Sequence, residues 1–390
     1  RRVRKEAFET LLGTYSQFRT TYAALLSSSV QKDRFYSSQR KYDSDLDGAL
    51  SPNLIPTSVY HNLVDTVNDR LPLLHRYMGI KKKAMGLEEL HLYDLYVPIQ
   101  ENPFGPFSYD QGVEVMMAGL APLGEEYNGD LKKGMTSGWI DRYENKGKRS
   151  GAYSWGVYGA HPFVLLNYQN KLDDVLTLSH EMGHAMHSYY SQKHQPYSNS
   201  DYTIFCAEVA STTNEALVLR HLLKNAKTKE ERIFLLTQMA ESIRTTLYRQ
   251  TLFAEFELYI HGVVQDKGSI TADDMEAKWV ELYKKYYGSD VVIDEVVKSE
   301  WSRIPHFYRD FYVYQYATGI SAAWAFADQI EQKGDAGRDA YLKFLQSGSS
   351  EDSITILKNA GVDMSTPAPI EATLKQFEWV LDELEKELGK

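Results

Sequence analysis

The stretch at residues 178–187 contains the pattern His-Glu-x-x-His, and it constrains the chain more than any other segment. If the stretch is helical, His180 and His184 lie about 40° apart on one face and about 6 Å apart along the axis, so both imidazoles can reach one ion. Glu181 projects beside them and can take a proton from a metal-activated water without being a ligand. The pattern therefore predicts a metal-dependent hydrolytic centre on a helix.

The residues around the two histidines suit a helix buried on more than one side, because they are apolar at helical spacings. These residues are Val175, Leu176, Leu178, Met182, Ala185 and Met186. Histidines are uncommon in such a core without partners. The alternative interpretation is a pair of hydrogen-bonded core histidines that bind no metal.

A zinc site with one open position needs a third protein ligand. A third histidine in the longer His-Glu-x-x-His-x-x-Gly-x-x-His pattern is excluded, because His187 and Tyr190 stand where that pattern has Gly and His. A glutamate on a following helix is the other common source, and Glu208 stands among small and apolar residues where an isolated carboxylate would be costly to bury. Glu208 is therefore the predicted third ligand.

Two further residues are candidates for supporting roles at this site. His187 is predicted to hydrogen-bond within the site instead of ligating the ion. Glu215 lies seven residues after Glu208, two turns along one helix face, and could accept the free N–H of a ligating histidine. The alternative for Glu215 is a solvated helix face.

Composition excludes several classes of protein. The chain has 390 residues and a net charge of −10, which argues against nucleic-acid binding by phosphate neutralisation. No apolar run approaches about 18 residues, so we expect no membrane span. The single cysteine, Cys206, excludes an intrachain disulfide, and no secretory signal is in view, so a cytoplasmic location is expected. Because residues 1–5 lack an initiator Met and run into a helical pattern, we expect residues missing upstream.

Apolar positions recur at three- and four-residue spacings through most of the chain, which predicts a mainly α fold. The helices are predicted at residues 8–26, 57–78, 113–120, 122–132, 201–223, 229–261, 271–287, 308–331, 335–346 and 370–388. Neither a repeat nor a linker is evident, so residues 1–390 are predicted to form a single catalytic unit, with a helical N-terminal part at 1–88 and a metal-binding core at 89–390.

Strand-forming residues occur at 90–97, 152–159 and 162–168. The last two segments come just before the histidine helix, which predicts a small β-sheet beside it. An edge strand there could hold a peptide through main-chain hydrogen bonds. An ordinary hairpin with a glycine bulge is the alternative.

The sequence resembles the oligoendopeptidase F branch of the thimet oligopeptidase (M3) family of zinc metallopeptidases. The resemblance is carried by residues 180–187, Glu208, residues 249–257 and residues 305–319. It implies that His180, His184 and Glu208 bind one Zn²⁺ per chain and that Glu181 is the base. It also implies a mainly helical ellipsoid with a deep channel that admits short unstructured peptides. Family members have a longer N-terminal helical region, so we expect the missing upstream residues to complete the channel.

The resemblance further implies that His306, Tyr312 and Tyr316 face the substrate. Tyr312 and Tyr316 would share a face of a helix, where a hydroxyl could donate to an oxyanion. Gly319 falls near this face and would leave room for a peptide backbone. The alternative is an aromatic core stripe, with His306 capping a helix.

These features together predict a zinc-dependent endopeptidase that hydrolyses short unstructured oligopeptides through a metal-activated water. One alternative is a metallocarboxypeptidase of similar helical fold, which needs a cation for the terminal carboxylate of its substrate. Four arginines are available for that purpose: Arg244, Arg249, Arg303 and Arg309. A non-catalytic helical peptide-binding protein is the other alternative, although such a protein has no need for Glu181.

Overall fold

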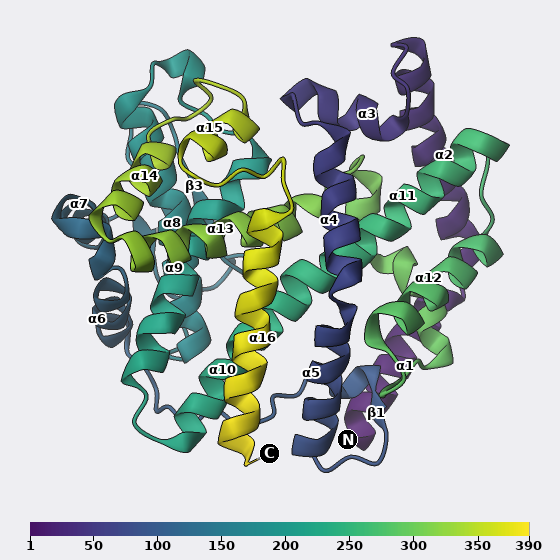
Figure 1. Cartoon of the computed structure of the whole chain (residues 1–390), viewed down its shortest axis with the longest axis horizontal. Coiled ribbons are helices and arrows are strands. Elements are labelled where there is room, and N and C mark those ends of the chain that lie inside the picture. Colours follow the sequence, from purple (N-terminus) through teal and green to yellow (C-terminus); the bar gives the residue numbers. More distant parts are fainter. Residues whose placement is uncertain (390) are drawn as a thin grey trace. The chain divides into compact units, whose positions relative to one another are not determined.

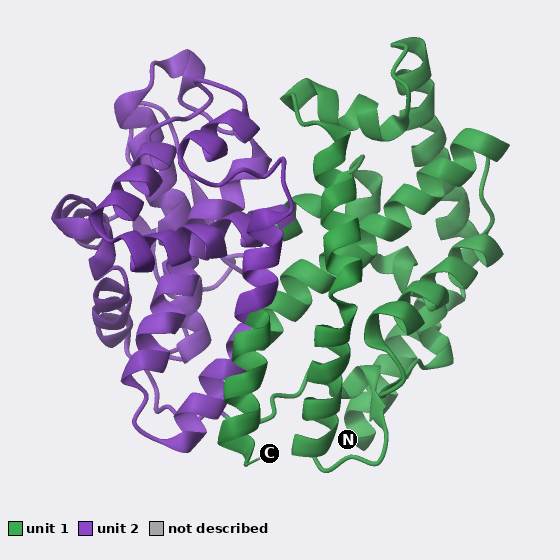
Figure 2. Cartoon of the chain, in the orientation of Figure 1, with its two compact units in different colours: residues 1–101, 240–317, 377–390 green, residues 102–239, 318–376 purple. Residues whose placement is uncertain are grey.

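The computed structural model describes residues 1–389, and 71% of the chain is helix and 3% is strand. The predicted mainly α fold with a small sheet is therefore confirmed. The chain divides into two compact units, unit 1 with residues 1–101, 240–317 and 377–390, and unit 2 with residues 102–239 and 318–376 (Figure 2). The predicted division at residue 88 into two parts of one catalytic unit stays a prediction.

Unit 1 is built mainly from helices. α4 (Thr57–Asp69) runs almost end to end into α5 (Leu71–Ala84), with Pro72 in the first turn of α5 (Figure 1). The other elements of unit 1 are α1 (Arg2–Ser16), α2 (Arg19–Gln39), α3 (Asp45–Leu50), η1 (Ser51–Asn53), β1 (Leu90–His91), η2 (Leu92–Asp94), η5 (Arg244–Tyr248), α11 (Arg249–Lys267), α12 (Ala272–Tyr287), β5 (Val291–Val292), η6 (Glu295–Arg303) and η7 (Pro305–Tyr308).

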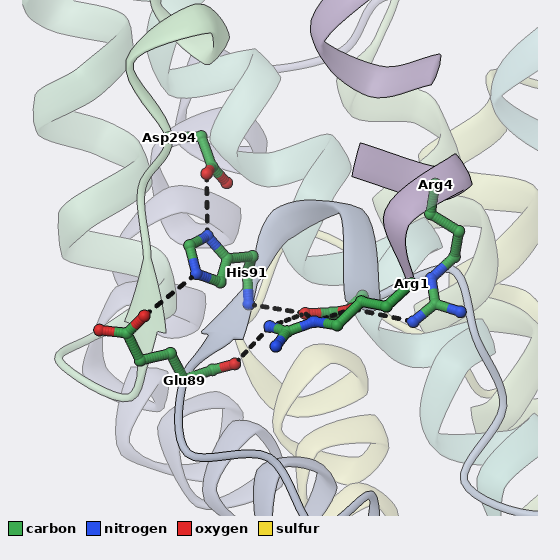
Figure 3. Close-up of polar contacts among 6 residues, drawn as sticks. Arg1, Arg4, Glu89, His91 and Asp294 are labelled. Carbon is green, nitrogen blue, oxygen red and sulfur yellow. Dashed lines mark hydrogen bonds and ion pairs between the residues drawn. The ribbon is translucent and has the colours of Figure 1, made fainter. Parts of the chain in front are cut away.

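A polar cluster ties α1 to the short parallel pair formed by β1 and β5 (Figure 3). Asp94 is fully buried and accepts hydrogen bonds from Arg1 at 2.7 Å and Arg4 at 3.0 Å, while His91 Nδ1 lies 2.8 Å from Asp294 (Figure 3). Burial alone would raise the pKa of Asp94, but the hydrogen bonds from the two arginines hold it below its usual value. The carboxylate of Asp94 is thus charged and paired.

The strand predicted at residues 90–97 is right only for its first two residues. Asp94 also accepts the backbone N–H of His91 at 3.2 Å, which closes a 3₁₀ turn over Leu92–Asp94. A local side-chain hydrogen bond has therefore replaced the extended conformation that these strand-forming residues favour.

Unit 2 holds the sheet of three strands β2 (Ile140–Asp141), β4 (Phe163–Leu165) and β3 (Tyr153–Trp155), in that order. β4 pairs parallel to β2 and antiparallel to β3, and both β3 and β4 contact α8 (Leu172–His194). The predicted sheet beside the histidine helix is confirmed. The other elements of unit 2 are α6 (Tyr109–Gly119), η3 (Ala121–Leu123), α7 (Gly124–Thr136), η4 (Tyr197–Asn199), α9 (Ile204–Asn225), α14 (Asp335–Leu345) and α15 (Ser353–Asn359).

Local sequence explains where α8 begins and ends. Asp174 accepts the backbone N–H of Lys171 at 2.8 Å, and Asp173 adds a second acidic residue to the first turn, where the positive end of the helix dipole favours it. Lys193 and His194 occupy the last turn, where cations are favoured. Of its six apolar residues predicted to be buried, Val175, Leu178, Met182, Ala185 and Met186 are fully buried, whereas Leu176 is partly exposed and lines a cavity.

Four predicted helices differ from the structure in their continuity. The helix predicted at 57–78 is divided at Arg70 into α4 and α5. The helix predicted at 8–26 is broken at residues 17–18, and the one predicted at 229–261 is interrupted by the π-helical turn η5 between α10 (Lys229–Ile243) and α11. The helix predicted at 308–331 begins only at Tyr314, as α13 (Tyr314–Lys333). Like α10 and α13, α16 (Ala368–Leu388) contributes residues to both units.

Among the helices of residues 1–389, none combines the length and the apolar character needed to cross a membrane.

Candidate metal centre

α8 and α9 lie side by side with their backbones in close approach (Figure 1). A Cβ added at Gly183 would lie 2.6 Å from Ser211 Cα and 2.7 Å from the Ala210 carbonyl oxygen, so only glycine fits there. Asn214 reinforces the contact by donating to the Ser179 carbonyl at 3.2 Å. The distance between the two helices is therefore fixed by backbone contact, and the side chains that they carry toward each other inherit that spacing.

Three predicted ligands meet between these helices. His180 Nε2 lies 3.2 Å from His184 Nε2 and 3.5 Å from Glu208 Oε2, and His184 Nε2 lies 3.6 Å from the same carboxylate oxygen. Ligands bound to Zn²⁺ at about 2.0–2.1 Å in a tetrahedron stand roughly 3.3–3.5 Å apart. The three atoms thus have the spacing of three corners of a tetrahedral zinc site, and this donor set fits the ion that the sequence predicts.

Glu215 holds the other nitrogen of His180. Its Oε1 lies 2.5 Å from His180 Nδ1, which leaves Nε2 facing the cluster. Burial lowers the pKa of His180, but the hydrogen bond and the charge of Glu215 outweigh burial and raise it to about 9. Glu215 thus has the position expected for it, and the solvated-face alternative does not hold.

His184 is held by the backbone. Its ring makes a hydrogen bond with the backbone of Ala207, the residue before Glu208. Burial and the neighbouring charge of His180 lower the pKa of His184 to about 4. His184 is therefore neutral at pH 7, which is the form that coordinates metal ions.

Glu181 lies next to the cluster without joining it. Only 6% of its surface is exposed. Burial raises the pKa of Glu181 to about 7, with a further contribution from the negative charge of Glu208 that the charge of His180 opposes. A carboxyl with this pKa can both accept and release a proton near neutral pH.

A cavity of about 660 Å³ in unit 2 reaches His180, Glu181 and Glu215. Its lining comes from α8, from the segment between β2 and β3, from the segment after β4 and from Glu215 of α9. It is lined by Glu144, Lys148, Ser150, Gly151, Ala152, Leu166, Asn167, Tyr168, Gln169, Asp174, Leu176, Thr177, His180, Glu181 and Glu215. The candidate centre is therefore open to a molecule larger than water.

Ser211 and Gly319 of unit 2 hold Glu208 in place. The sequence alone did not connect either residue with Glu208. Ser211 Oγ donates to Glu208 Oε2 at 3.2 Å, and a Cβ at Gly319 would lie 3.2 Å from Glu208 Cβ. Gly319 thus makes room for Glu208, whereas the sequence analysis expected it to make room for a peptide backbone. The spacing Glu208-x-x-Ser211 on one helix could have indicated the first contact.

His187 does not make the hydrogen bond predicted for it. Its ring stacks on Tyr202 at 3.7 Å, and its Nδ1 has no hydrogen-bond partner within residues 1–389. Complete burial lowers the pKa of His187 to about 3. His187 is therefore a neutral core residue that packs against Tyr202 and is not hydrogen-bonded within the site.

The remaining predicted site residues form their own cluster in unit 1. His306 and Tyr312 stack with ring centroids 5.9 Å apart, and the hydroxyl of Tyr316 lies 3.1 Å from the Tyr312 hydroxyl and 3.4 Å from His306 Nε2. Tyr312 precedes α13, so the two tyrosines meet without sharing a helix face, contrary to the sequence argument. The role of this half-buried trio toward a substrate stays a prediction.

Two histidines one turn apart, a glutamate beside them and a second glutamate from the next helix make up the donor set that a His-Glu-x-x-His metal centre requires. The chain belongs to peptidase family M3, whose sequence model matches residues 1–376. The resemblance noted from the sequence is thereby confirmed.

The chain is similar along its whole length to oligopeptidase PepF of Bacillus subtilis, with 50% identity over 390 residues. It covers 58% of that relative. A crystal structure from Chlamydophila abortus superposes with a TM-score of 0.92 and 42% identity, covering 98% of this chain and 64% of that one. Oligoendopeptidase-F from Enterococcus faecium gives a TM-score of 0.81 and 37% identity over 100% of this chain and 64% of that one. The chain therefore spans less than two thirds of the length of each of these three relatives.

Proposed function

We propose that the chain carries the catalytic centre of a zinc endopeptidase that cleaves short unstructured oligopeptides. The observation that carries the proposal is the tetrahedral spacing of His180 Nε2, His184 Nε2 and Glu208 Oε2 beside the buried carboxyl of Glu181. Membership of peptidase family M3 and the names of the relatives support the same activity.

His180, His184 and Glu208 would hold one Zn²⁺, and three protein ligands leave one position open, as catalytic zinc sites do. The bound ion would supply a Lewis acid that polarises a peptide carbonyl and acidifies water. Glu215 keeps the Nδ1 proton of His180 in place, so that Nε2 presents its lone pair to the ion. The close backbone contact of α8 and α9 holds the donors at this spacing.

Glu181 would act as the base. Its carboxyl lines the cavity next to His180, where it can take a proton from the attacking water and pass it to the leaving amine. General-base and general-acid assistance of this kind contributes about 10²–10⁴-fold to rate. His306, Tyr312 and Tyr316 are proposed to donate hydrogen bonds to the oxyanion, as the family resemblance implies.

The peptide would lie along β3. This strand pairs with β4 on one side, and residues 151–152 just before it line the cavity. Its free edge offers backbone N–H and C=O groups to an extended peptide, a mode of recognition that accepts many sequences. An unfolded oligopeptide can make these bonds, whereas a folded protein has its backbone groups already paired.

A carboxypeptidase would need an available arginine, and three of the four candidates are already paired with a glutamate. Arg244 pairs with Glu241 at 2.6 Å, and Arg249 and Arg303 both pair with Glu300, at 2.7 and 2.8 Å. In the cavity lining, Lys148 pairs with Asp141 at 3.2 Å. A cation that is already paired binds a terminal carboxylate weakly. Arg309 is exposed and lies over the Tyr312 ring at 4.1 Å without an ion pair within residues 1–389, so it is the one arginine of the four that a carboxypeptidase could use.

The proposal is tested by combining metal analysis with peptide cleavage. The protein is freed of metal with a chelator, reloaded with Zn²⁺ and incubated with a peptide pool that includes peptides blocked at both termini, and mass spectrometry finds the products. Internal cleavage of blocked peptides that depends on Zn²⁺ is expected, and Glu208→Ala should lower zinc affinity because one of three ligands is lost. Cleavage that proceeds unchanged after complete metal removal would refute the zinc mechanism, and release of single residues from free C-termini alone would favour the carboxypeptidase.

A further inference from the structure

A second group of acidic side chains surrounds a histidine inside unit 1. Asp33 of α2, Asp45 at the start of α3, Glu257 of α11 and Asp310 gather around His261 of α11. Asp33, Asp45, Glu257 and His261 are buried, and Asp310 is partly exposed. Burying several carboxyl groups together is costly unless a positive charge compensates for them.

His261 is oriented like a metal ligand. It is only 3% exposed, and its Nδ1 lies 3.1 Å from Asp45 Oδ2. Its other nitrogen, Nε2, lies 3.9 Å from Asp310 Oδ1, too far for a hydrogen bond, and both atoms lack any hydrogen-bond partner within residues 1–389. His261 thus has a carboxylate on one ring nitrogen, while its second nitrogen faces another carboxylate. His180 in unit 2 has the same arrangement, with Glu215 as the carboxylate on its Nδ1.

The protein cations near this cluster do not balance its charge. Lys32 lies 3.0 Å from Asp33 and is exposed, and Arg34 lies 3.6 Å from Asp45 and is partly exposed. These two paired cations face four carboxyl groups, and Arg40 and Arg309 line cavities beside Asp310 without an ion pair to the cluster. The cluster therefore calls for either protons or a bound cation.

We propose that Asp33, His261 and Asp310 form a second, non-catalytic site for a divalent first-row metal ion. One ligand atom from each residue lies within 4.8 Å of the others, close enough for a single ion to draw them together. A mixed imidazole and carboxylate set suits Mn²⁺ or Zn²⁺ better than Ca²⁺ or Mg²⁺, which prefer oxygen alone. A cavity of about 390 Å³, lined in part by Lys32, Asp33 and Asp310, gives an ion a path from solvent.

The ion would stabilise the segment that carries Tyr312. Phe311 has a left-handed backbone, with φ of 45°, and its N–H donates to Glu257 Oε1 at 3.0 Å. Asp310 immediately precedes it. An ion shared by α2, α11 and Asp310 would therefore hold this strained turn, and with it Tyr312, without touching a substrate.

Metal stoichiometry tests the proposal without using activity. Chelated protein is dialysed against Zn²⁺ or Mn²⁺ alone, and bound metal is counted by mass spectrometry for the parent and for His184→Ala, Asp310→Asn and His91→Gln. His91 also lies between carboxylates, Asp294 at 2.8 Å and Glu89 at 3.5 Å, but it belongs to no group within residues 1–389 whose ligand atoms lie close enough together to hold one ion, so His91→Gln is the matched control. Two ions per chain are expected for the parent and for His91→Gln, and one for each of the other two variants.

The outcomes separate this site from the proposed zinc centre. If Asp310→Asn binds as much metal as the parent, the second site is refuted, whatever His184→Ala shows. If His184→Ala leaves binding unchanged and Asp310→Asn loses one ion, the zinc centre fails and the second site stands.

A melting experiment covers the case in which Asp310→Asn does not fold. In His184→Ala, Mn²⁺ at 100 times its dissociation constant should raise Tm by several degrees. If Tm does not rise at Mn²⁺ or Zn²⁺ concentrations up to millimolar, the proposal is wrong, and protons on the carboxyl groups of the cluster take the place of the ion.

Discussion

Glu215 Oε1 lies 2.5 Å from His180 Nδ1, although the two residues are 35 positions apart on neighbouring helices. In the neutral imidazole, this hydrogen bond favours the tautomer of His180 in which Nδ1 carries the proton and Nε2 is free. It also places a negative charge behind a predicted metal ligand, which makes the imidazole a stronger donor. The metal affinity of the centre should therefore depend on a residue that does not touch the ion.

Glu215→Gln should lower zinc affinity by about 10–100-fold while keeping one ion per chain at saturating zinc. The amide oxygen can still accept the hydrogen bond from His180 Nδ1–H, but the side chain has no charge. Competition with a fluorescent zinc chelator measures the affinity. Glu230→Gln, an exposed glutamate of the same unit, is the control. An affinity equal to that of the parent would show that Glu215 does not support the centre.

Glu181→Gln should keep zinc and lose at least about 10²-fold in kcat, because the amide preserves shape but cannot accept a proton. Steady-state kinetics on a blocked peptide and metal analysis of the same sample give both values. Glu144→Gln changes another carboxylate of the same cavity and should leave kcat within a few-fold of the parent. Activity of Glu181→Gln within about tenfold of the parent would exclude it as the base.

Tyr312→Phe and Tyr316→Phe distinguish an oxyanion donor from a core aromatic. If either hydroxyl donates in the transition state, its removal should lower kcat by about 10²-fold with little change in KM, metal content or Tm. Tyr308→Phe, an exposed tyrosine outside the trio, controls for the loss of a hydroxyl. Normal kcat in both variants with a lowered Tm would place the pair in the core.

Gly183→Ala should destabilise the protein by about 1–3 kcal/mol, because the new methyl group would overlap the Ser211 and Ala210 backbone, which cannot rotate away. It should also weaken metal binding by pushing Glu208 away from the histidines. Gly129→Ala on α7 meets no atom within 4 Å and should instead stabilise slightly, by about 0.5–1 kcal/mol. Urea unfolding of both variants tests the pair, and equal stabilities would contradict the close contact.

Asp94→Asn should make the free energy of unfolding depend less on pH in the acid range. The pKa of Asp94 is lower in the folded chain than its ordinary 3.8, so its stabilisation is present above pH about 4 and is lost as pH falls through the folded pKa. At pH 7 the variant should be about 1–2 kcal/mol less stable than the parent, and this difference should shrink toward pH 3. Asp69→Asn, an exposed aspartate, is the control. A difference that stays constant with pH would show that charge pairing is not the cause.

The helix α8 was predictable because the pattern that defines it lies within one short stretch of sequence. Helical periodicity placed His180 and His184 on one face, and the cost of burying Glu208 identified a third donor that the structure brings within 3.6 Å of both. The contact of Gly183 with Ser211 was not predictable, because it depends on how two helices pack, and a single sequence shows the period of each helix but not their separation.

The turn before α13 shows why other parts were missed. Residues 308–313 carry aromatic and apolar side chains, interrupted by Arg309 and Asp310, and contain no glycine or proline that would mark a break. Phe311 nevertheless takes a left-handed backbone, and Glu257, 54 residues earlier, accepts its N–H inside the core. The break at η5 is of the same kind, since residues 244–248 carry no glycine or proline that would mark it. Both features come from tertiary contacts that override local preference.

The edge of β3 has a consequence for self-association. An open strand edge is where two copies of a protein can join, and among the described residues β3 pairs with β4 alone. Gly151, with φ of 90°, and Gly156, packed against Ser188, end the strand after three residues. A second copy could add only a few hydrogen bonds, each worth about 1 kcal/mol, against an association cost of at least about 4 kcal/mol. An edge this short cannot hold a dimer together, yet it can align a peptide that is also held at the metal centre.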